Sequence, residues 1–430
     1  MKDNFQIILI IVCIAAAVVG LLVFSGAIPL GGTDKTAGSG TVIVWGTFPG
    51  TAVNPLLEDF NNANPNFITK YVQKSPDTFD QELLESLASG NGPDMFFLSG
   101  DLAFHYSNKI ASIPYSTVSI QSFQQAFASA SEVFLGSNGI LALPLTVDPL
   151  VMYYNRGMLD ANGIPYPPSN WEDLVNMVPA LTKRDDNNKI IKSTVAFGHY
   201  SNVAHAKDIL SMLFMQAGNK IVKTVDGRLT SDLGLSSGPY SLENILKFYT
   251  KFADPGQSVY SWNKSFPSSP DVFIADNSAF YFGYASELSS ILNKNPNLNF
   301  LVAPVPQIKG ANFKLTSAHV TGVAISSFSK NINTAYIAAS AMSNGNFAVK
   351  LAQNLGVVPA RRDLLAIKQT DPYSPIFYSS TLFARTWLDP SPKDTDDIFR
   401  KMIDGVISNT MAPDSAVLDA DSKLSLLLNK

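Results

Sequence analysis

Two segments that each end an apolar strand at a single carboxylate constrain the fold of this chain more than any other feature. The first reads GNGPDMFFLSGD at Gly90–Asp101, and the second reads LALPLTVDPLVMYYNRGML at Leu141–Leu159. Each combines a short apolar run with Gly or Pro punctuation, as buried strands do. The carboxylates Asp101 and Asp148 are therefore predicted to lie at strand ends, where ligands of α/β sheets bind. For Asp101 the alternative is an N-cap of a helix that begins near Leu102, and for Asp148 it is a structural turn.

A third segment places an aromatic residue in a similar position. Thr41–Gly50 reads TVIVWGTFPG, which predicts a strand that runs into a Gly/Pro turn with Trp45 at its exit. A tryptophan face stacks on the apolar face of a sugar ring while its N–H can still donate. An aromatic and two acids at strand ends suit a polar, ring-shaped ligand.

Strand and helix patterns alternate along the rest of the chain. MFFL, Ala279–Phe282 and Phe300–Pro304 predict strands. Helices are predicted by their apolar spacing at Asn54–Asn62, Phe79–Ala88, His205–Ala217, Leu242–Phe252 and Ile332–Met342, and Asn170 with Asp173 predicts a further helix start. A chain of 430 residues exceeds what one hydrophobic core usually supports, so two α/β lobes are expected.

The N-terminus predicts a membrane anchor. Phe5–Phe24 is an apolar run interrupted only by Gln6, and as a helix it is about 30 Å long, enough to span a bilayer core. Lys2 favours a cytoplasmic N-terminus for residues 1–4, with everything after residue 24 outside the cytoplasm. A cleaved signal peptide is the alternative, because small residues follow at 25–27. The anchor is favoured because the run exceeds a usual signal-peptide core. Residues 25–40 are expected to be a flexible linker to a domain at 41–430.

Composition excludes several function classes. The net charge of −4 is spread without long runs, so no nucleic-acid surface is expected. The single cysteine, Cys13, permits no internal disulfide and no thiolate metal cluster. We expect no cofactor and no metal.

The enzyme-like motifs are weak. GLSSG at 234–238 matches a nucleophile motif but lacks the preceding strand. The four histidines form no recognised ligand pair. Tyr153 and Tyr154, as strand neighbours, face opposite ways and cannot share a metal. No catalytic residue is assigned, although Asp101 with Asp148 leaves a glycosidase pair open as an alternative.

Several motifs in a fixed order resemble those of the extracellular solute-binding proteins of ABC importers, in the group that includes sugar receptors. They are VIVWG, LLEDFNNANP, GNGPD, LPLTVDPLVMYYN, PPSNWEDL, AFYFGYASEL, APVPQ and GVVPARRDL, and together they cover about residues 41–430. The resemblance implies a periplasmic-binding-protein-like fold in which a multi-strand hinge joins two α/β lobes. It also implies a monomeric receptor that binds its solute without making or breaking a covalent bond, so no enzymatic activity is expected.

The resemblance implies boundaries for the lobes. Lobe 1 would comprise about 41–147 and 307–343, and lobe 2 about 148–302 and 344–430. The chain would cross between them near Thr146–Pro149, Ala303–Gln307 and Ser343–Asn346, with the ligand between the lobes.

It also implies further contacts beyond Trp45, Asp101 and Asp148. Tyr284 falls where relatives place a strand exit bearing an aromatic. Trp262 lies in a polar lobe 2 loop, and Trp387 precedes a Pro-rich turn near the C-terminal wall of the cleft. Trp171 is expected to be core. Leu98 and Leu102 stand where maltose receptors have an aromatic and an arginine, which argues against maltodextrin.

The expected function is capture of a sugar or oligosaccharide outside the cell membrane and delivery to ABC permease subunits. Two alternatives remain open at this point. One is a membrane-anchored glycan-active hydrolase, and the other is a surface sensor or adhesin on the same scaffold.

Overall fold

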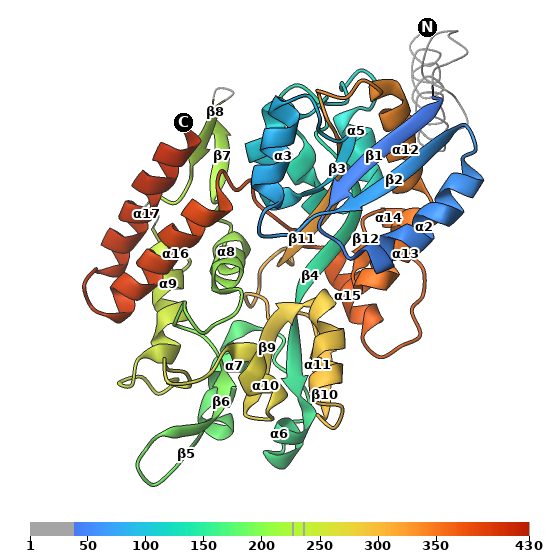
Figure 1. The fold of residues 1–430 in the computed structure, drawn as a ribbon. Helices are drawn as coiled ribbons and strands as arrows, with labels where there is room; N and C mark the ends of the chain where they lie inside the picture. Colours follow the sequence, from blue (N-terminus) through green and yellow to red (C-terminus); the bar gives the residue numbers. More distant parts are fainter. Residues whose placement is uncertain (1–37, 226–227, 235–236, 430) are drawn as a thin grey trace, which may run out of the picture. The chain divides into compact units, whose positions relative to one another are not determined.

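The computed structural model describes residues 38–225, 228–234 and 237–429 (Figure 1). Within these ranges no helix is long and apolar enough to cross a membrane. The anchor predicted at Phe5–Phe24 and most of the predicted linker lie outside the described residues.

The chain forms two compact units. Unit 1 comprises the chain up to Val147 together with Val320–Ile367, and unit 2 comprises Asp148–His319 and the chain from Lys368 onward. The chain thus passes from one unit to the other at 147/148, 319/320 and 367/368, whereas the expected crossings lay near 146–149, 303–307 and 343–346.

Packing explains why the segment after residue 343 belongs to unit 1. Phe347 of α13 (Asn346–Leu355) contacts Phe60 of α2 (Gly50–Ala63), with ring centroids 5.6 Å apart. Val358 then pairs with Val147 in β12 (Val358–Pro359). These contacts hold residues 346–359 against unit 1.

The sheet of unit 1 is mostly parallel at its start. β1 (Gly40–Gly46) pairs in parallel with β2 (Phe67–Gln73) and β3 (Met95–Ser99), and β3 pairs antiparallel with β11 (Thr316–Ile325). Val42, Val44 and Gly46 of β1 are buried, whereas Trp45 on the other face is partly exposed. The other helices of this unit are α3 (Phe79–Ala88), η1 (Gly100–Leu102), α4 (Ala103–Tyr106), η2 (Ser107–Lys109), α5 (Ile120–Ala126), η3 (Ser129–Phe134), α12 (Ile332–Asn344) and α14 (Arg362–Leu365).

The sheet of unit 2 is built around β4 (Leu143–Asn155), whose residues from Asp148 onward belong to this unit. β4 pairs antiparallel with β9 (Ser278–Tyr284) and β10 (Phe300–Ala303), and β9 pairs in parallel with β6 (Ile190–Val195). All residues of β9 are buried, as expected for a strand with neighbours on both sides.

Short strands and helices complete unit 2. The strands are β5 (Lys183–Arg184), β13 (Ala384–Arg385) and the hairpin of β7 (Val222–Val225) and β8 (Arg228–Ser231). The helices are α6 (Arg156–Ala161), α7 (Trp171–Leu181), α8 (Ala206–Gln216), α9 (Leu242–Thr250), η4 (Lys251–Ala253), α10 (Ser269–Ile274), η5 (Ala285–Glu287), α11 (Leu288–Lys294), α15 (Ser374–Thr381), α16 (Pro392–Ile407) and α17 (Pro413–Leu428).

An aromatic core holds unit 2 together. Trp171 is only 5% exposed, its ring stacks on Phe282 at 5.7 Å, and its Nε1 donates to Gln216 Oε1 at 2.7 Å. Asn170 caps α7 by accepting from the backbone N–H of Asp173 at 2.9 Å. The predicted helix start and the predicted core role of Trp171 are both confirmed.

Candidate functional site

Unit 2 gathers ionisable side chains at the ends of its strands. Asp148, on β4, is the residue at which the chain enters unit 2. His319, on β11, is the last residue before the chain returns to unit 1. Tyr284 ends β9, and Glu287 follows in η5, while His205 and Asp208 begin α8. We call Asp148, His205, Asp208, Tyr284, Glu287 and His319 the acid–histidine cluster.

Asp148 is a partly exposed carboxylate with spare hydrogen-bonding capacity. Its Oδ1 accepts from the backbone N–H of Ser286 at 3.1 Å. Burial raises the pKa of Asp148 to about 6, and the neighbouring Glu287 adds to this, while Ser286 and His319 act in the opposite direction. A carboxylate offers about four lone-pair positions, so one N–H leaves it able to accept from a ligand.

Glu287 is already fully engaged. Its Oε1 accepts from the backbone N–H of Tyr284 at 2.8 Å and lies 2.8 Å from Nε2 of His205, and its Oε2 accepts from the hydroxyl of Tyr281. Burial alone would raise its pKa, but these partners hold the pKa of Glu287 below its ordinary value. This side chain therefore stays ionised and organises the turn after β9.

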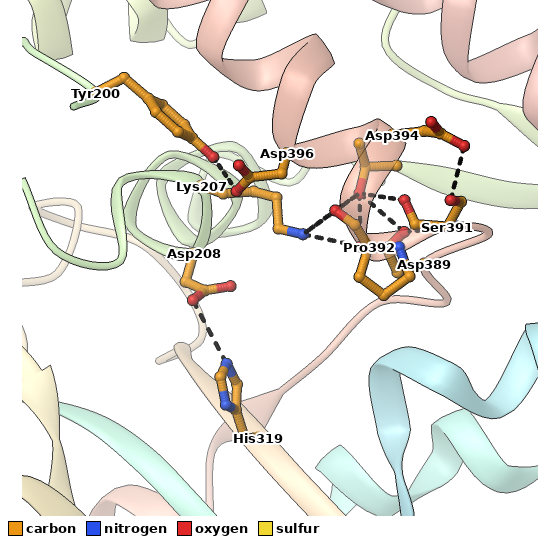
Figure 2. A network of polar contacts seen from close by, with 10 residues as sticks. Tyr200, Lys207, Asp208, His319, Asp389, Ser391, Pro392, Asp394 and Asp396 are labelled. Carbon is orange, nitrogen blue, oxygen red and sulfur yellow. Dashed lines mark hydrogen bonds and ion pairs between the residues drawn. The ribbon is translucent and has the colours of Figure 1, made fainter. Parts of the chain in front are cut away.

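Asp208 pairs with the second histidine of the cluster. His319 Nε2 lies 3.4 Å from Asp208 Oδ2, as Figure 2 shows. Burial would raise the pKa of Asp208, but His319, His205 and Lys207 lower it overall. The second carboxylate of the cluster is thus also held in its charged form.

Tyr284 lies between the two imidazoles. Its ring centroid is 4.8 Å from that of His205 and 4.2 Å from that of His319. The side chain is 3% exposed, and burial followed by the Asp208 carboxylate raises the pKa of its hydroxyl well above the ordinary value. The hydroxyl makes no hydrogen bond of acceptable geometry in the described structure, although Asp208 and Ser317 lie beside it.

His205 has a left-handed backbone, with φ of 59°. This conformation is uncommon outside glycine and is concentrated at functional sites. It places the imidazole against Glu287 at the start of α8.

A second polar network begins at Lys207, the residue before Asp208 of the cluster. Lys207 Nζ lies 3.1 Å from Asp389 Oδ2 and donates to Pro392 O and Thr395 Oγ1, each at 3.3 Å (Figure 2). Burial raises the pKa of Asp389 although Lys207 and Thr395 oppose it. Tyr200 donates to Asp396 in the same network.

Four of the predicted contacts lie in unit 2, and their environments differ. Asp148 and Tyr284 meet in the acid–histidine cluster. Trp387 is partly exposed, its ring stacks on Phe399 at 6.2 Å, and it lies two residues before Asp389.

Trp262 requires a correction. It is 0% exposed, its ring stacks on Phe266 at 4.6 Å, and its Nε1 donates to Asn202 Oδ1 at 3.0 Å. In this structure its face is covered and its N–H is satisfied, so Trp262 belongs to the core of unit 2.

Tyr284 also differs from the expectation in its role. Because its ring is buried between His205 and His319, it does not present an open stacking face. The hydroxyl of Tyr284, and not its ring face, is therefore the group that could bind a ligand.

The two predicted contacts in unit 1 are more exposed. Trp45 is partly exposed, and Lys74 Nζ lies 3.8 Å from the centroid of its ring. Asp101 is exposed in η1 and makes no side-chain cap, so its expected alternative as an N-cap is not seen. Both stay predicted ligand contacts.

Sequence reasoning missed His205, Asp208, Glu287 and His319. Glu287 lies within the quoted segment AFYFGYASEL, three residues after Tyr284, and could have been proposed as its partner. His205 and His319 are far apart in sequence and carry no local motif. Within the described part of the chain, no group of three His, Cys, Asp or Glu side chains is arranged to hold a metal.

Comparisons with known proteins agree on one family and one fold. Residues 56–406 match the family model described as bacterial extracellular solute-binding protein. No curated protein matches the chain.

Three solved structures illustrate the fold. A cyclic α-maltosyl-1,6-maltose binding protein from Arthrobacter globiformis has a TM-score of 0.76 at 13% identity and covers 91% of this chain and 99% of its own. An ABC substrate-binding protein from Listeria monocytogenes, in complex with cycloalternan, has a TM-score of 0.68 at 17% identity, with coverages of 91% and 99%. A receptor of Streptomyces glaucescens studied with acarbose has a TM-score of 0.69 at 15% identity, with coverages of 91% and 99%.

Proposed function

The chain belongs to the bacterial extracellular solute-binding proteins, and from that premise we propose that it captures a carbohydrate and delivers it to the permease of an ABC transporter. The similar structures support a carbohydrate as the solute, since their ligands are cyclic maltosyl-maltose, cycloalternan and acarbose.

One observation of this chain carries the proposal. Asp148 is a partly exposed carboxylate at a strand end that receives one backbone N–H and keeps further acceptor capacity. Sugar hydroxyls are suitable donors for such a carboxylate, and charge-assisted hydrogen bonds are about twice as strong as neutral ones. Asp148 is therefore the proposed orienting contact.

Aromatic faces would supply the apolar part of the contact. Trp387 has one ring face on Phe399 and remains partly exposed, so it is the proposed stacking surface in unit 2. Trp45 and Asp101 are the proposed contacts of unit 1. The expectation that two lobes close on the solute remains a prediction.

The location of the receptor is a further proposal. We place the binding domain outside the cytoplasm, held to the cell membrane by the apolar run at Phe5–Phe24 and working as a monomer. The family supports the extracytoplasmic side. The length and hydropathy of that run support an anchor that is retained.

A glycoside hydrolase is a second candidate, because Asp148 has a raised pKa beside an ionised Glu287. Glycosidases use one protonated carboxyl as the general acid and one ionised carboxylate as the nucleophile or base. Against this role, both oxygens of Glu287 already have partners in His205, Tyr281 and Tyr284. A carboxylate so engaged is poorly placed as a nucleophile or base, so we propose binding without hydrolysis.

A titration series tests this function. The full-length protein is purified in detergent and titrated calorimetrically with neutral oligosaccharides, in parallel with Asp148→Ala. We expect a saturable sugar complex that Asp148→Ala weakens about 10-fold or more, since a hydrogen bond to a charged group contributes about 1.5–3 kcal/mol. Chromatography of the titrated sugar after overnight incubation should return it intact.

Asp160→Ala is the matched control, because it removes an exposed carboxylate of unit 2 that pairs with Arg156. It should bind like the parent protein. If no carbohydrate binds, or if the sugar is cleaved, the proposed function is wrong.

A further inference from the structure

We infer that the carbohydrate recognised by unit 2 carries a protonated amine, which the acid–histidine cluster receives. This inference rests on the proposed function and narrows its ligand class.

The charge balance of the cluster is the first argument. Asp148, Asp208 and Glu287 supply its carboxylates, and its two imidazoles carry positive charge only when protonated. The nearby Lys207 is directed into a different ion pair, with Asp389, whose side chain is 4% exposed. The cluster thus holds more negative charge than the fixed cations around it compensate.

The cost of this arrangement favours a cationic ligand. Partly buried charges are destabilising unless they are paired, and the ion-pair partners of Asp208 and Glu287, whose side chains are 20% and 25% exposed, are histidines that carry positive charge only when protonated. A neutral sugar would desolvate these carboxylates further and bring no compensating charge. An ammonium group would bring that charge and three N–H donors.

The hydroxyl of Tyr284 is the second, independent argument. It is buried with the side chain 3% exposed, and it makes no hydrogen bond of acceptable geometry within the described structure. Its charged neighbours are Asp208 and Asp148. A phenolic oxygen can accept a hydrogen bond, so an ammonium bound at Asp208 beside this hydroxyl could also donate to Tyr284.

The alternative of a metal ion is less consistent with the cluster. The described residues contain no group of His, Cys, Asp and Glu with ligand geometry. Glu287 is occupied by three partners, and the imidazoles of His205 and His319 are directed at carboxylates.

Three sugars of equal length separate the possibilities. A β-1,4-linked glucosamine oligomer, its N-acetylated form and the corresponding glucose oligomer are titrated calorimetrically into the detergent-solubilised full-length protein at about pH 7. We expect the amine form to bind at least about 10-fold more tightly than the other two, and more weakly as salt rises. Spermidine is included as an amine without a sugar.

Isosteric variants then locate the contact. Asp208→Asn should reduce the affinity for the glucosamine oligomer about 10-fold and change that for the glucose oligomer by less than about 3-fold, whereas Asp148→Asn should weaken the binding of both oligomers by about 10-fold or more. Tyr284→Phe removes only the hydroxyl, so it should weaken amine binding without lowering the melting temperature. Asp160→Asn is the control for charge removal elsewhere on unit 2.

The outcomes distinguish this inference from the function on which it rests. If the glucose or N-acetylated oligomer binds as tightly as the glucosamine oligomer or more tightly, the inferred amine is wrong, but the proposed sugar receptor is still supported. Binding of spermidine with no sugar bound overturns the carbohydrate proposal itself. Normal amine binding by Tyr284→Phe and both Asn variants overturns the assigned location.

Discussion

Replacing Asp148 with asparagine should stabilise the unliganded protein at neutral pH while weakening its binding of solute. The new side chain keeps an oxygen that accepts from the N–H of Ser286, so the hydrogen bond observed at 3.1 Å is preserved. The substitution removes only the free-energy cost of ionising a carboxyl whose pKa burial raises from 3.8 to about 6. The stability effect must therefore depend on pH in a defined way.

The sign follows from proton linkage. Because the folded state binds the Asp148 proton more tightly than the unfolded state, the contribution of Asp148 to the unfolding free energy falls as pH rises from about 4 to about 6. A shift of this size corresponds to about 3 kcal/mol, which the partial solvent contact of the side chain reduces to about 2 kcal/mol. The amide of the Asp148→Asn variant does not titrate, so position 148 costs that variant no unfolding free energy as the pH rises from about 4 to about 6.

The assay is thermal unfolding of both proteins between about pH 4 and pH 8. The melting temperatures should agree near pH 4 and separate to about 4–8 °C in favour of Asp148→Asn above about pH 6.5, given about 2–4 °C per kcal/mol for domains of this size. The groups facing Asp148, namely Ser286, Glu287 and His319, remain in both proteins. If the Asp148→Asn variant is equally destabilised at both ends of this pH range, burial of the Asp148 carboxylate is not the cause of the stability difference.

Other substitutions separate core from ligand contacts and test the anchor. Trp171→Ala should cost about 3–5 kcal/mol in chemical denaturation and leave the affinity of the folded fraction little changed. Trp387→Ala should weaken sugar binding in calorimetry with a small loss of melting temperature, whereas Trp262→Ala should lower the melting temperature sharply; the reverse pattern would contradict both assignments. In cell fractionation the full-length chain should stay with membranes at 46.5 kDa even after Cys13→Ser, and recovery of a mature protein beginning near Ile28 would contradict the retained anchor.

The elements with strong local patterns could be predicted from the sequence. The helix expected at Phe79–Ala88 has those bounds as α3, and the helix expected at His205–Ala217 is α8 at Ala206–Gln216. β11 was not predicted, although it is a long strand at Thr316–Ile325. Its neighbours β3 and β13 are distant in sequence, so its pairing has no local signal.

The site was predictable only where a residue lies at a recognisable strand end. Asp148 and Tyr284 satisfied that condition, and the structure brings both into one cluster. Their partners His205 and His319 come from separate elements, so only the tertiary fold makes them neighbours.

Trp262 shows why polar flanking residues mislead. Its loop reads YSWNKSF, yet Phe266 covers its ring and Asn202 binds its Nε1. The four-residue spacing of Trp262 and Phe266 was the available sign that the two rings pack on each other.

A crystal structure with the tightest-binding oligosaccharide would show whether Asp148 and Trp387 contact the sugar. We expect a sugar substituent within hydrogen-bonding distance of an Asp148 oxygen and a sugar ring packed on Trp387. A fully occupied sugar that touches neither residue, with Asp148 still bonded only to Ser286, would contradict it.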